Sequence, residues 1–235
     1  MSISLSQQAY QHIKGMLLSF ELNGEARVSE HTLAKKMRIS RTPVREAIRR
    51  LQDEGVLYQV PSSGTYISRP NRKQIVEMYE LRLALEAMAV VKAAKRMTRA
   101  QRFEIDASID RMRAGVRAFR DSGKPIMDGE PLRQFLSGDL EFHRLIMTAG
   151  ANIAAYKIIN DVHVRHAVFG FQTHRRNLRH VARALLCHAR VAAAIQRHDP
   201  KAARKHLRIH IRQSLRAALA AHDAAEAAPD LQPPI

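Results

Sequence analysis

The segment between residues 30 and 68 limits the folds open to this chain more than any other segment. Its apolar residues recur twice at helical spacing and then fall into two short runs. The pattern predicts helices at 30–37 and 41–54 and strands at 56–60 and 65–68. Arg38-Ile39-Ser40 joins the two helices tightly, and Pro61-Ser62-Ser63-Gly64 fits a turn between the strands. Two short helices followed by a hairpin predict a winged helix-turn-helix.

The second of these helices carries an arginine stripe. Arg41, Arg45 and Arg49 recur every four residues and so share one face, away from the apolar face. Arginine is suited to two parallel hydrogen bonds to guanine or to a phosphate. Thr42 could contact a phosphate or a thymine methyl group, and Gly64 would let the hairpin tip approach the DNA backbone. The stripe alone also fits an ordinary solvated surface, but helix, turn, striped helix and wing together favour DNA binding.

The composition changes near residue 70, where helix-forming residues become dominant. We therefore expect a mainly α fold, with a winged helix-turn-helix domain at 1–69, a linker at 70–72 and an antiparallel all-helical bundle at 73–221. The first domain begins with a helix at 5–20, and Asn23-Gly24 breaks the chain after it. Six helices are expected in the bundle, at 73–97, 99–121, 131–149, 152–170, 176–197 and 200–221. Residues 222–235 are expected to form a flexible tail.

The net charge of +17 makes polyanions obvious partners, but its distribution matters more than its sum. Residues 1–69 contain 10 basic and 6 acidic residues, whereas residues 70–235 contain 29 and 16. Most of the excess therefore lies outside the segment assigned to DNA, where a solvated basic surface would also account for it. Without an apolar run or secretory signal, and with Cys187 as its one cysteine, the chain is expected in the cytoplasm, not in a membrane.

One aspartate and three histidines replace apolar residues on predicted buried stripes. Asp139 and His143 are one helical turn apart, while His188 and His210 each lie 11 residues from the turn at Asp199. In an antiparallel helix pair, both histidines would lie roughly 16 Å from that turn. Three imidazoles and a carboxylate suit a divalent transition metal such as Zn, Ni or Mn.

Other interpretations of these residues stay open at this stage. The four groups could form a buried polar cluster held by internal hydrogen bonds and water. His163 with His166 and His206 with His210 are rival pairs; His206 is off the apolar stripe and is expected to be exposed.

The quoted residues of the first domain resemble a known family. The matching pieces are Leu33-Ala34, Ser40-Arg41-Thr42-Pro43-Val44-Arg45-Glu46-Ala47-Ile48, Leu51, Glu54-Gly55, Pro61 and Gly64. They resemble the GntR family of bacterial regulators. The resemblance implies that Arg41, Thr42 and Arg45 contact DNA, with Arg49 further along the helix and Gly64 in the wing. Family members often carry a basic residue where this chain has Ser63.

The resemblance extends into the second domain, to the FCD effector domain of the FadR-like branch. The matching pieces are Leu81-Arg82, Leu85-Glu86, Asp139-Leu140-Glu141-Phe142-His143, Ala149-Gly150-Ala151-Asn152, His188 and His210. It implies that Asp139, His143, His188 and His210 bind the metal in a bundle that also binds small carboxylates. Arg82 has two interpretations: it binds an effector carboxylate, or it pairs with Glu86 at i, i+4 on an exposed face.

These observations lead to one main hypothesis. The chain is expected to be a homodimeric transcription regulator that binds double-stranded operator DNA and is controlled by a small organic acid beside the metal. The sequence contains no His-Glu-x-x-His motif, nucleophile elbow or Gly-rich phosphate loop, so an enzyme is not expected. The alternatives are a metal-dependent hydrolase and a direct metal sensor.

Overall fold

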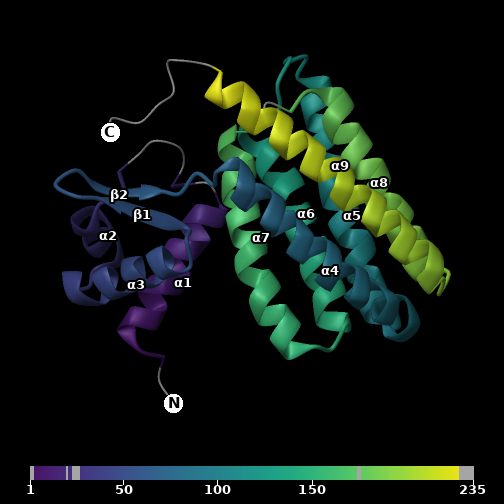
Figure 1. Cartoon of the computed structure of the whole chain (residues 1–235), viewed down its shortest axis with the longest axis horizontal. Coiled ribbons are helices and arrows are strands. Elements are labelled where there is room, and N and C mark those ends of the chain that lie inside the picture. The colour runs from purple at the N-terminus through teal and green to yellow at the C-terminus, as the bar shows by residue number, and fades with distance from the viewer. Residues whose placement is uncertain (1–2, 20, 23–26, 174–175, 228–235) are drawn as a thin grey trace. The chain divides into compact units, whose positions relative to one another are not determined.

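A computed structural model describes residues 3–19, 21–22, 27–173 and 176–227 (Figure 1). The chain divides into two compact units: Met1–Pro70 with Val164–Gln172, and Asn71–His163 with Thr173–Pro229. The first unit ends at Pro70, and residues 164–172 group with it, which was not predicted. The expected break at Asn23-Gly24 and the end of the expected tail lie outside the described residues.

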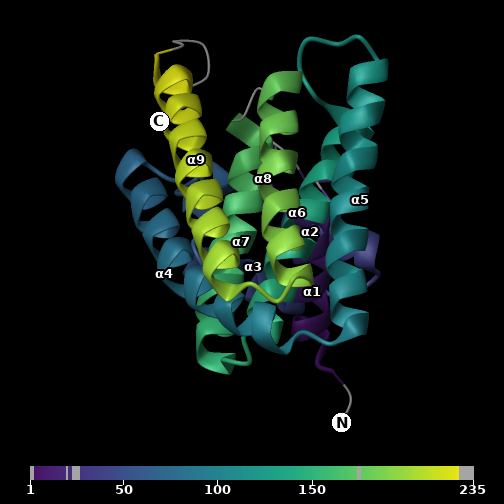
Figure 2. The ribbon, with the colours of Figure 1, turned by 90° about the vertical axis from the view of Figure 1, so that its right-hand side faces the viewer.

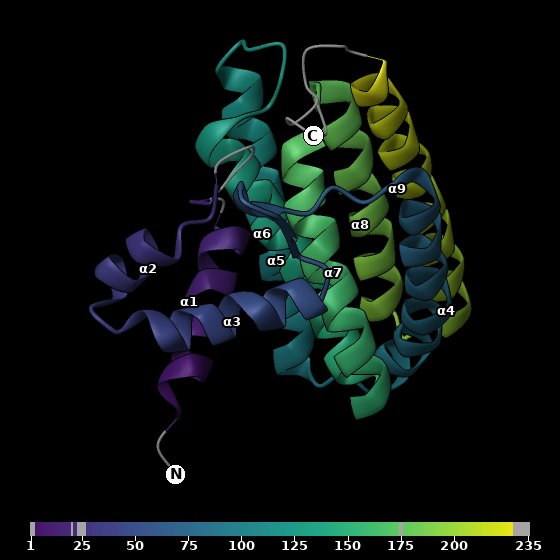
Figure 3. The same ribbon diagram turned by 60° about the vertical axis from the view of Figure 1, so that its left-hand side comes forward.

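The first unit contains the predicted helices and hairpin. Its elements are α1 (Leu5–Leu18), α2 (Glu30–Met37), α3 (Arg41–Asp53), β1 (Leu57–Val60) and β2 (Gly64–Ile67). Figure 3 shows α2 and α3 joined by a tight turn, in which Arg38 adopts a left-handed conformation (φ 55°). The Ser29 side chain accepts a hydrogen bond from the Thr32 amide and so begins α2. The fold of this unit is therefore the predicted winged helix-turn-helix.

The hairpin is antiparallel, with Leu57 opposite Ile67 and Val60 opposite Gly64. An isolated bridge adds Val28 to the outer side of β2, where the Val28 amide donates to the Thr65 carbonyl at 2.8 Å. Leu57, Ile67 and Val28 are buried in the same core as the apolar face of α3. The wing is thus fixed to the helices by its inward side chains, while its turn stays at the surface.

The second unit is a bundle of long helices. They are α4 (Arg72–Arg96), α5 (Arg99–Asp121), α6 (Gly129–Ala149), α7 (Ile153–Thr173), α8 (Leu178–Gln196) and α9 (Pro200–Glu226). Of α7, the part up to His163 belongs to this unit, whereas Val164–Gln172 groups with the first unit. Asn71 and Thr98 form capping boxes at the starts of α4 and α5. As predicted, Asp199 caps α9 and Pro200 occupies its first turn. The helix expected to end at residue 221 continues to Glu226, because its run of alanines extends the helical pattern.

Packing within the bundle brings helices from distant parts of the sequence together. α9 packs against both α4 and α8, and α5 packs against α6 and α8; Figure 2 shows α8 and α9 side by side. Small residues allow α5 and α6 to approach closely, because a Cβ added at Gly138 would lie 2.7 Å from the Ser108 carbonyl oxygen. This contact fixes the position of α6, the helix that carries Asp139 and His143. In the described part of the chain, no helix is both long and apolar enough to cross a membrane.

Candidate functional site

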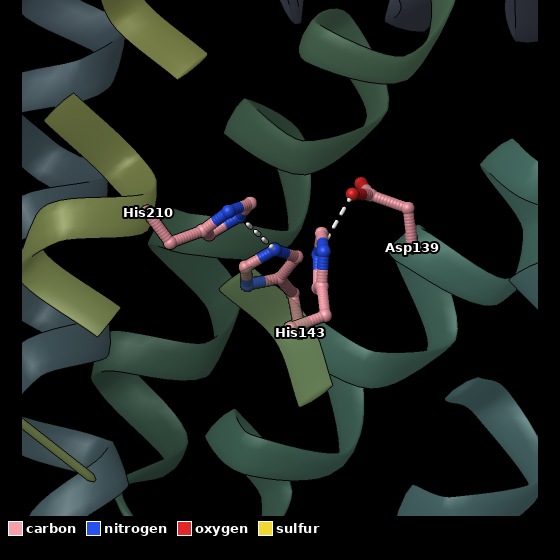
Figure 4. A group of neighbouring side chains, drawn as sticks. Asp139, His143 and His210 are labelled. Atoms are coloured by element: carbon pink, nitrogen blue, oxygen red, sulfur yellow. Dashed lines mark hydrogen bonds and ion pairs between the residues drawn. The ribbon is translucent and has the colours of Figure 1, made fainter. Parts of the chain in front are cut away.

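The four residues predicted to bind a metal come together inside the bundle. Asp139 and His143 lie one turn apart on α6, His188 is on α8 and His210 is on α9. One possible ligand atom from each residue lies within 4.8 Å of those of the others. The three histidines are buried, and Figure 4 shows Asp139, His143 and His210 pointing toward one another. The His188 and His210 rings are 4.1 Å apart between centroids, as expected from their equal distance to the turn at Asp199.

Hydrogen bonds at the outer ring nitrogens determine which nitrogens face the centre of this cluster. His188 Nδ1 lies 2.8 Å from the Ala184 carbonyl oxygen, which can only accept, so Nδ1 carries the proton. His188 Nε2 is buried without a hydrogen bond and lies 3.0 Å from an Asp139 carboxylate oxygen. An inward lone pair close to a carboxylate is the arrangement that a divalent cation needs.

His143 is oriented in the same way by a carboxylate behind it. Its Nδ1 donates to Glu86 at 2.5 Å, which leaves a lone pair on Nε2. This Nε2 accepts a hydrogen bond from Arg82 Nη2 at 3.1 Å and lies 3.2 Å from His210 Nε2. The donor set of three imidazole nitrogens and one carboxylate therefore fits a transition metal, with Glu86 as the residue that orients one ligand.

Glu86 forms a second buried cluster with two histidines. Its carboxylate accepts from Arg82 Nε at 2.7 Å and from His163 Nε2 at 2.9 Å, in addition to His143. The possible ligand atoms of Glu86, His143 and His163 also lie within 4.8 Å of one another. Sequence reasoning missed this role of Glu86, although its place on the helical series Tyr79, Arg82, Glu86, Ala93, all of which are buried, was a usable signal.

The prediction of an exposed Arg82–Glu86 pair was wrong in its location. The pair forms, but Arg82 is 1% and Glu86 0% exposed, because both face the interior of the bundle. Arg82 Nη1 is buried without a hydrogen-bond partner in the described part of the chain. His206, expected to be exposed, is half-buried, while His163, an open alternative, contacts the cluster through Glu86.

Burial sets the protonation of the cluster. Desolvation lowers the pKa of His143 to about 4, and it lowers the pKa of His210 well below its ordinary value. Burial alone would raise the pKa of Glu86, but the charge of Arg82 and the hydrogen bond from His143 outweigh it and hold this pKa well below its ordinary range. At neutral pH His143 and His210 are therefore neutral and Glu86 is ionised, the forms needed for two metal ligands and for a carboxylate that orients one of them.

The residues predicted to contact DNA lie in the winged helix-turn-helix unit, on α3 and at the wing turn. Arg41, Thr42, Arg45 and Arg49 are all exposed on α3, with the apolar face buried behind them. Arg45 and Arg41 pair with Glu30 at the start of α2, at 3.2 and 3.4 Å. The Arg45 guanidinium lowers the pKa of the Glu30 carboxyl, so Glu30 is ionised at neutral pH. Sequence reasoning missed Glu30, because its distance of 15 residues from Arg45 follows no helical repeat.

The wing turn has a conformational requirement at Gly64. Its φ of +144° disfavours other residues, and an added Cβ would lie 2.4 Å from Arg27 Nε. Arg27, held beside β2 by the neighbouring Val28–Thr65 bridge, thus lies over the wing glycine. It supplies an exposed positive charge at the wing turn.

A winged helix-turn-helix with an exposed arginine helix, followed by a helical bundle with a buried polar centre, defines a two-domain class of DNA-binding proteins. Residues 5–67 match the bacterial regulatory proteins of the gntR family, and residues 77–213 match the FCD domain. The chain belongs to the GntR family of transcriptional regulators that carry an FCD domain. It is a regulator rather than an enzyme, which sets aside the hydrolase alternative.

Similar proteins agree with this assignment. The chain is 31% identical to the Nta operon transcriptional regulator of Aminobacter aminovorans, over 64% of this chain and 66% of that protein. It is 24% identical to the uncharacterized HTH-type transcriptional regulator YdhC of Bacillus subtilis, over 85% of this chain and 84% of that protein. E. coli McbR/YncC has the same fold, with a TM-score of 0.77 and 21% identity over 92% of this chain and 98% of that one. The structure of a putative transcriptional regulator GntR from Rhodococcus sp. RHA1 has a TM-score of 0.76 at 16% identity, over 92% of this chain and 97% of that one.

Proposed function

We propose that this protein is a homodimeric regulator, most simply a repressor, whose hold on operator DNA is controlled by a small organic acid in the second unit. The observation that carries the proposal is the cluster of half-buried Asp139 with the buried His143, His188 and His210, beside the cationic Arg82. Buried polar groups are costly unless they are satisfied, so a binding site accounts for them better than a structural core.

Asp139, His143, His188 and His210 would hold a divalent metal such as Zn, Ni or Mn. The inward lone pairs of His143 and His188, the low pKa of His210 and the nearby Asp139 carboxylate support this assignment. When bound, the metal would supply a Lewis-acidic centre for a carboxylate oxygen. Glu86 would keep the His143 ring in the required tautomer.

Arg82 would bind the carboxylate of the effector. Its Nη1 is buried without a partner in the described part of the chain, and its Nη2 is bonded to the His143 lone pair that a metal would take. Metal binding would therefore leave two arginine donors in fork geometry, which matches a carboxylate. Arg176 adds to the positive field: burial lowers its pKa to about 10, and the charge of Asp139 counteracts this shift.

On the DNA side, α3 would lie in the major groove, with Arg41, Thr42, Arg45 and Arg49 directed to bases or phosphates and Gly64 at the backbone. A dimer would place two such helices on half-sites related by two-fold symmetry. We expect the Arg41→Ala/Arg45→Ala double variant to lose at least about tenfold in operator affinity, because one good bidentate base contact contributes about 1–3 kcal/mol. Full affinity of this variant in a gel-shift assay would refute the recognition-helix assignment.

The effector site is tested by thermal melting against a panel of small organic acids, with and without a chelator. A ligand that binds only the folded state raises the melting temperature by mass action. We expect one acid to stabilise the protein only when metal is present, and His188→Ala to abolish this shift. His180→Ala, an exposed histidine on the same helix, is the control and should keep it.

Other outcomes separate the alternatives. If chelation lowers the melting temperature but no acid changes it, the metal is structural or is itself the signal, as in a direct metal sensor. If neither chelation nor any acid changes the melting temperature, the buried cluster is not a metal site.

A further inference from the structure

The positive charge of this chain is concentrated on two neighbouring helices outside the winged helix. Residues 177–222, which cover α8 and most of α9, contain ten arginine or lysine residues and one acidic residue, Asp199. This net of nine positive charges is more than half of the total of +17. The winged helix segment 1–69, with 10 basic and 6 acidic residues, carries only four.

On α9 the charges form a continuous line. Arg204, Arg208, Arg212 and Arg216 repeat every four residues, and Lys201 and Lys205 extend the line toward the start of the helix. We call these six residues the α9 ridge. All are exposed except Arg208, which is half-buried, and the ridge runs beside the buried stripe of Ala203, Leu207 and Ile211.

The ridge has no acidic counterpart. Between Pro200 and His222 the sequence contains no aspartate or glutamate. Among the described residues, the ion pairs of α9 involve only Asp223, His222 and Glu226 at its far end. Arginines on α5 and α6 differ, because Arg113 and Arg144 each pair with an acid three residues earlier.

This arrangement works against the stability of the helix. Like charges at i, i+4 destabilise a helix, and cations near the N-terminus oppose the helix dipole. The first turn of α9 has no acidic residue to compensate for Lys201. The fold therefore does not account for the ridge, and a polyanion that neutralises it does.

We propose that the α9 ridge binds the phosphate backbone of duplex DNA without sequence preference, as a second DNA-contacting surface outside the winged helix. Successive ridge arginines are about 6 Å apart along the helix axis, and the four span roughly 18 Å, a length that covers several phosphates. Arginine binds phosphate through paired hydrogen bonds, and DNA is the polyanion that this regulator already meets.

Two other occupants fit the ridge less well. A second copy of the chain would bring like charges together if it docked ridge to ridge. A membrane-surface helix inserts its apolar face into the lipid, but the apolar face of α9 is buried against the bundle, with Ala203 and Leu207 both 0% exposed. Duplex DNA can bind through the exposed cations of the α9 ridge alone, without contact to the apolar face of the helix.

The test uses the full-length protein and a labelled duplex of arbitrary sequence, with affinity measured by fluorescence anisotropy between about 50 and 200 mM salt. The ridge variant is Arg204→Gln/Arg208→Gln/Arg212→Gln/Arg216→Gln. We expect the slope of log affinity against log salt to fall by about 0.9 for each phosphate that the variant no longer neutralises. The control, Arg113→Gln/Arg120→Gln/Arg133→Gln/Arg144→Gln, makes the same charge change on α5 and α6 and should alter the slope much less.

Each other outcome overturns the proposal. Equal slopes in the ridge variant and the wild type, or equal decreases in the ridge and control variants, would show that the ridge makes no local contact with DNA. Loss of binding to polyglutamate with unchanged DNA binding would identify an acidic protein as the partner.

Circular dichroism verifies that the variants fold, and Arg208→Gln/Arg212→Gln replaces the fourfold variant if that variant is unfolded. The melting temperature of a folded ridge variant should not fall, because like-charge repulsion has been removed.

Discussion

At the scale of single residues, Glu86 connects the structural and functional roles of the bundle. It is fully buried, and its carboxylate accepts hydrogen bonds from Arg82, His143 and His163. Without that negative charge, the buried guanidinium of Arg82 would lose its ion-pair partner at 2.7 Å. The same carboxylate fixes the tautomer of a proposed metal ligand, so stability and metal affinity should change together.

We therefore expect Glu86→Gln to lower the free energy of unfolding by about 3–5 kcal/mol, the cost of breaking a buried ion pair. Denaturant unfolding in the presence of chelator measures this effect separately from metal binding. Glu80→Gln, an exposed change on the same helix, should stay within about 0.5 kcal/mol of the wild type. A Glu86→Gln protein as stable as the Glu80→Gln control would mean that Arg82 is not held as a buried ion pair.

Glu30 restrains the arginines of α3 in the free protein. Both its oxygens lie 3.3 Å from Arg45 Nε, and one lies 3.4 Å from Arg41 Nη2. DNA phosphates must compete with this carboxylate, so Glu30→Gln should strengthen binding to a duplex of arbitrary sequence by less than about tenfold, as for an exposed ion pair. Anisotropy titration measures the change. Glu21→Gln, which removes an exposed partner of Lys36, should have a smaller effect on DNA affinity. An equal effect would mean that the change in net charge, and not the release of Arg41 and Arg45, strengthens binding.

The residues also show where sequence reasoning stops. The helical spacing of Arg41, Arg45 and Arg49 is a local pattern, so their shared exposed face could be predicted. The Arg82–Glu86 pair is local as well, but its burial depends on His143 and His163, which are 57 and 77 residues from Glu86. A four-residue spacing is the same on a buried and an exposed face, so only the assembled bundle distinguishes them.

At the scale of elements, the contact between α5 and α6 determines where the candidate site forms. A Cβ at Gly138 would lie 2.7 Å from the Ser108 carbonyl oxygen, and a Cβ at Gly115 would lie 2.6 Å from the Pro131 carbonyl oxygen. The obstacles are backbone atoms, which cannot move aside as a flexible side chain can. Helix positions were predictable from periodicity, but this close approach was not, because it depends on which helices become neighbours.

Gly138→Ala should therefore destabilise the protein by about 1–3 kcal/mol through overpacking. It should also weaken metal binding, because Asp139 and His143 move with α6. Gly15→Ala is the matched control: it lies within α1 with nothing within 4 Å of the added Cβ, and it should stabilise by about 0.5–1 kcal/mol. Thermal melts and metal titrations of both variants test this, and unchanged metal affinity in Gly138→Ala would separate the site from the α5–α6 contact.

At the scale of the whole molecule, the proposed control requires that two sites influence one equilibrium. The winged helix and most of the bundle form two compact units, although Val164–Gln172 of α7 groups with the winged helix. An effector can change DNA binding only through its different affinity for the two states of the protein. The coupling is therefore a free energy shared by both ligands, and it must be the same when measured from either side.

This reciprocity gives a prediction that needs no structure of a complex. If the effector weakens operator binding about tenfold, saturating operator must weaken effector binding by the same factor. Calorimetric titration of the effector, with and without operator duplex, measures it directly. A duplex of arbitrary sequence, which sets no half-site spacing, is the control and should change effector affinity less. An effector that releases operator while its own affinity is unaffected by operator would not act through this equilibrium, and the organic-acid site beside Arg82 would then lose its regulatory role.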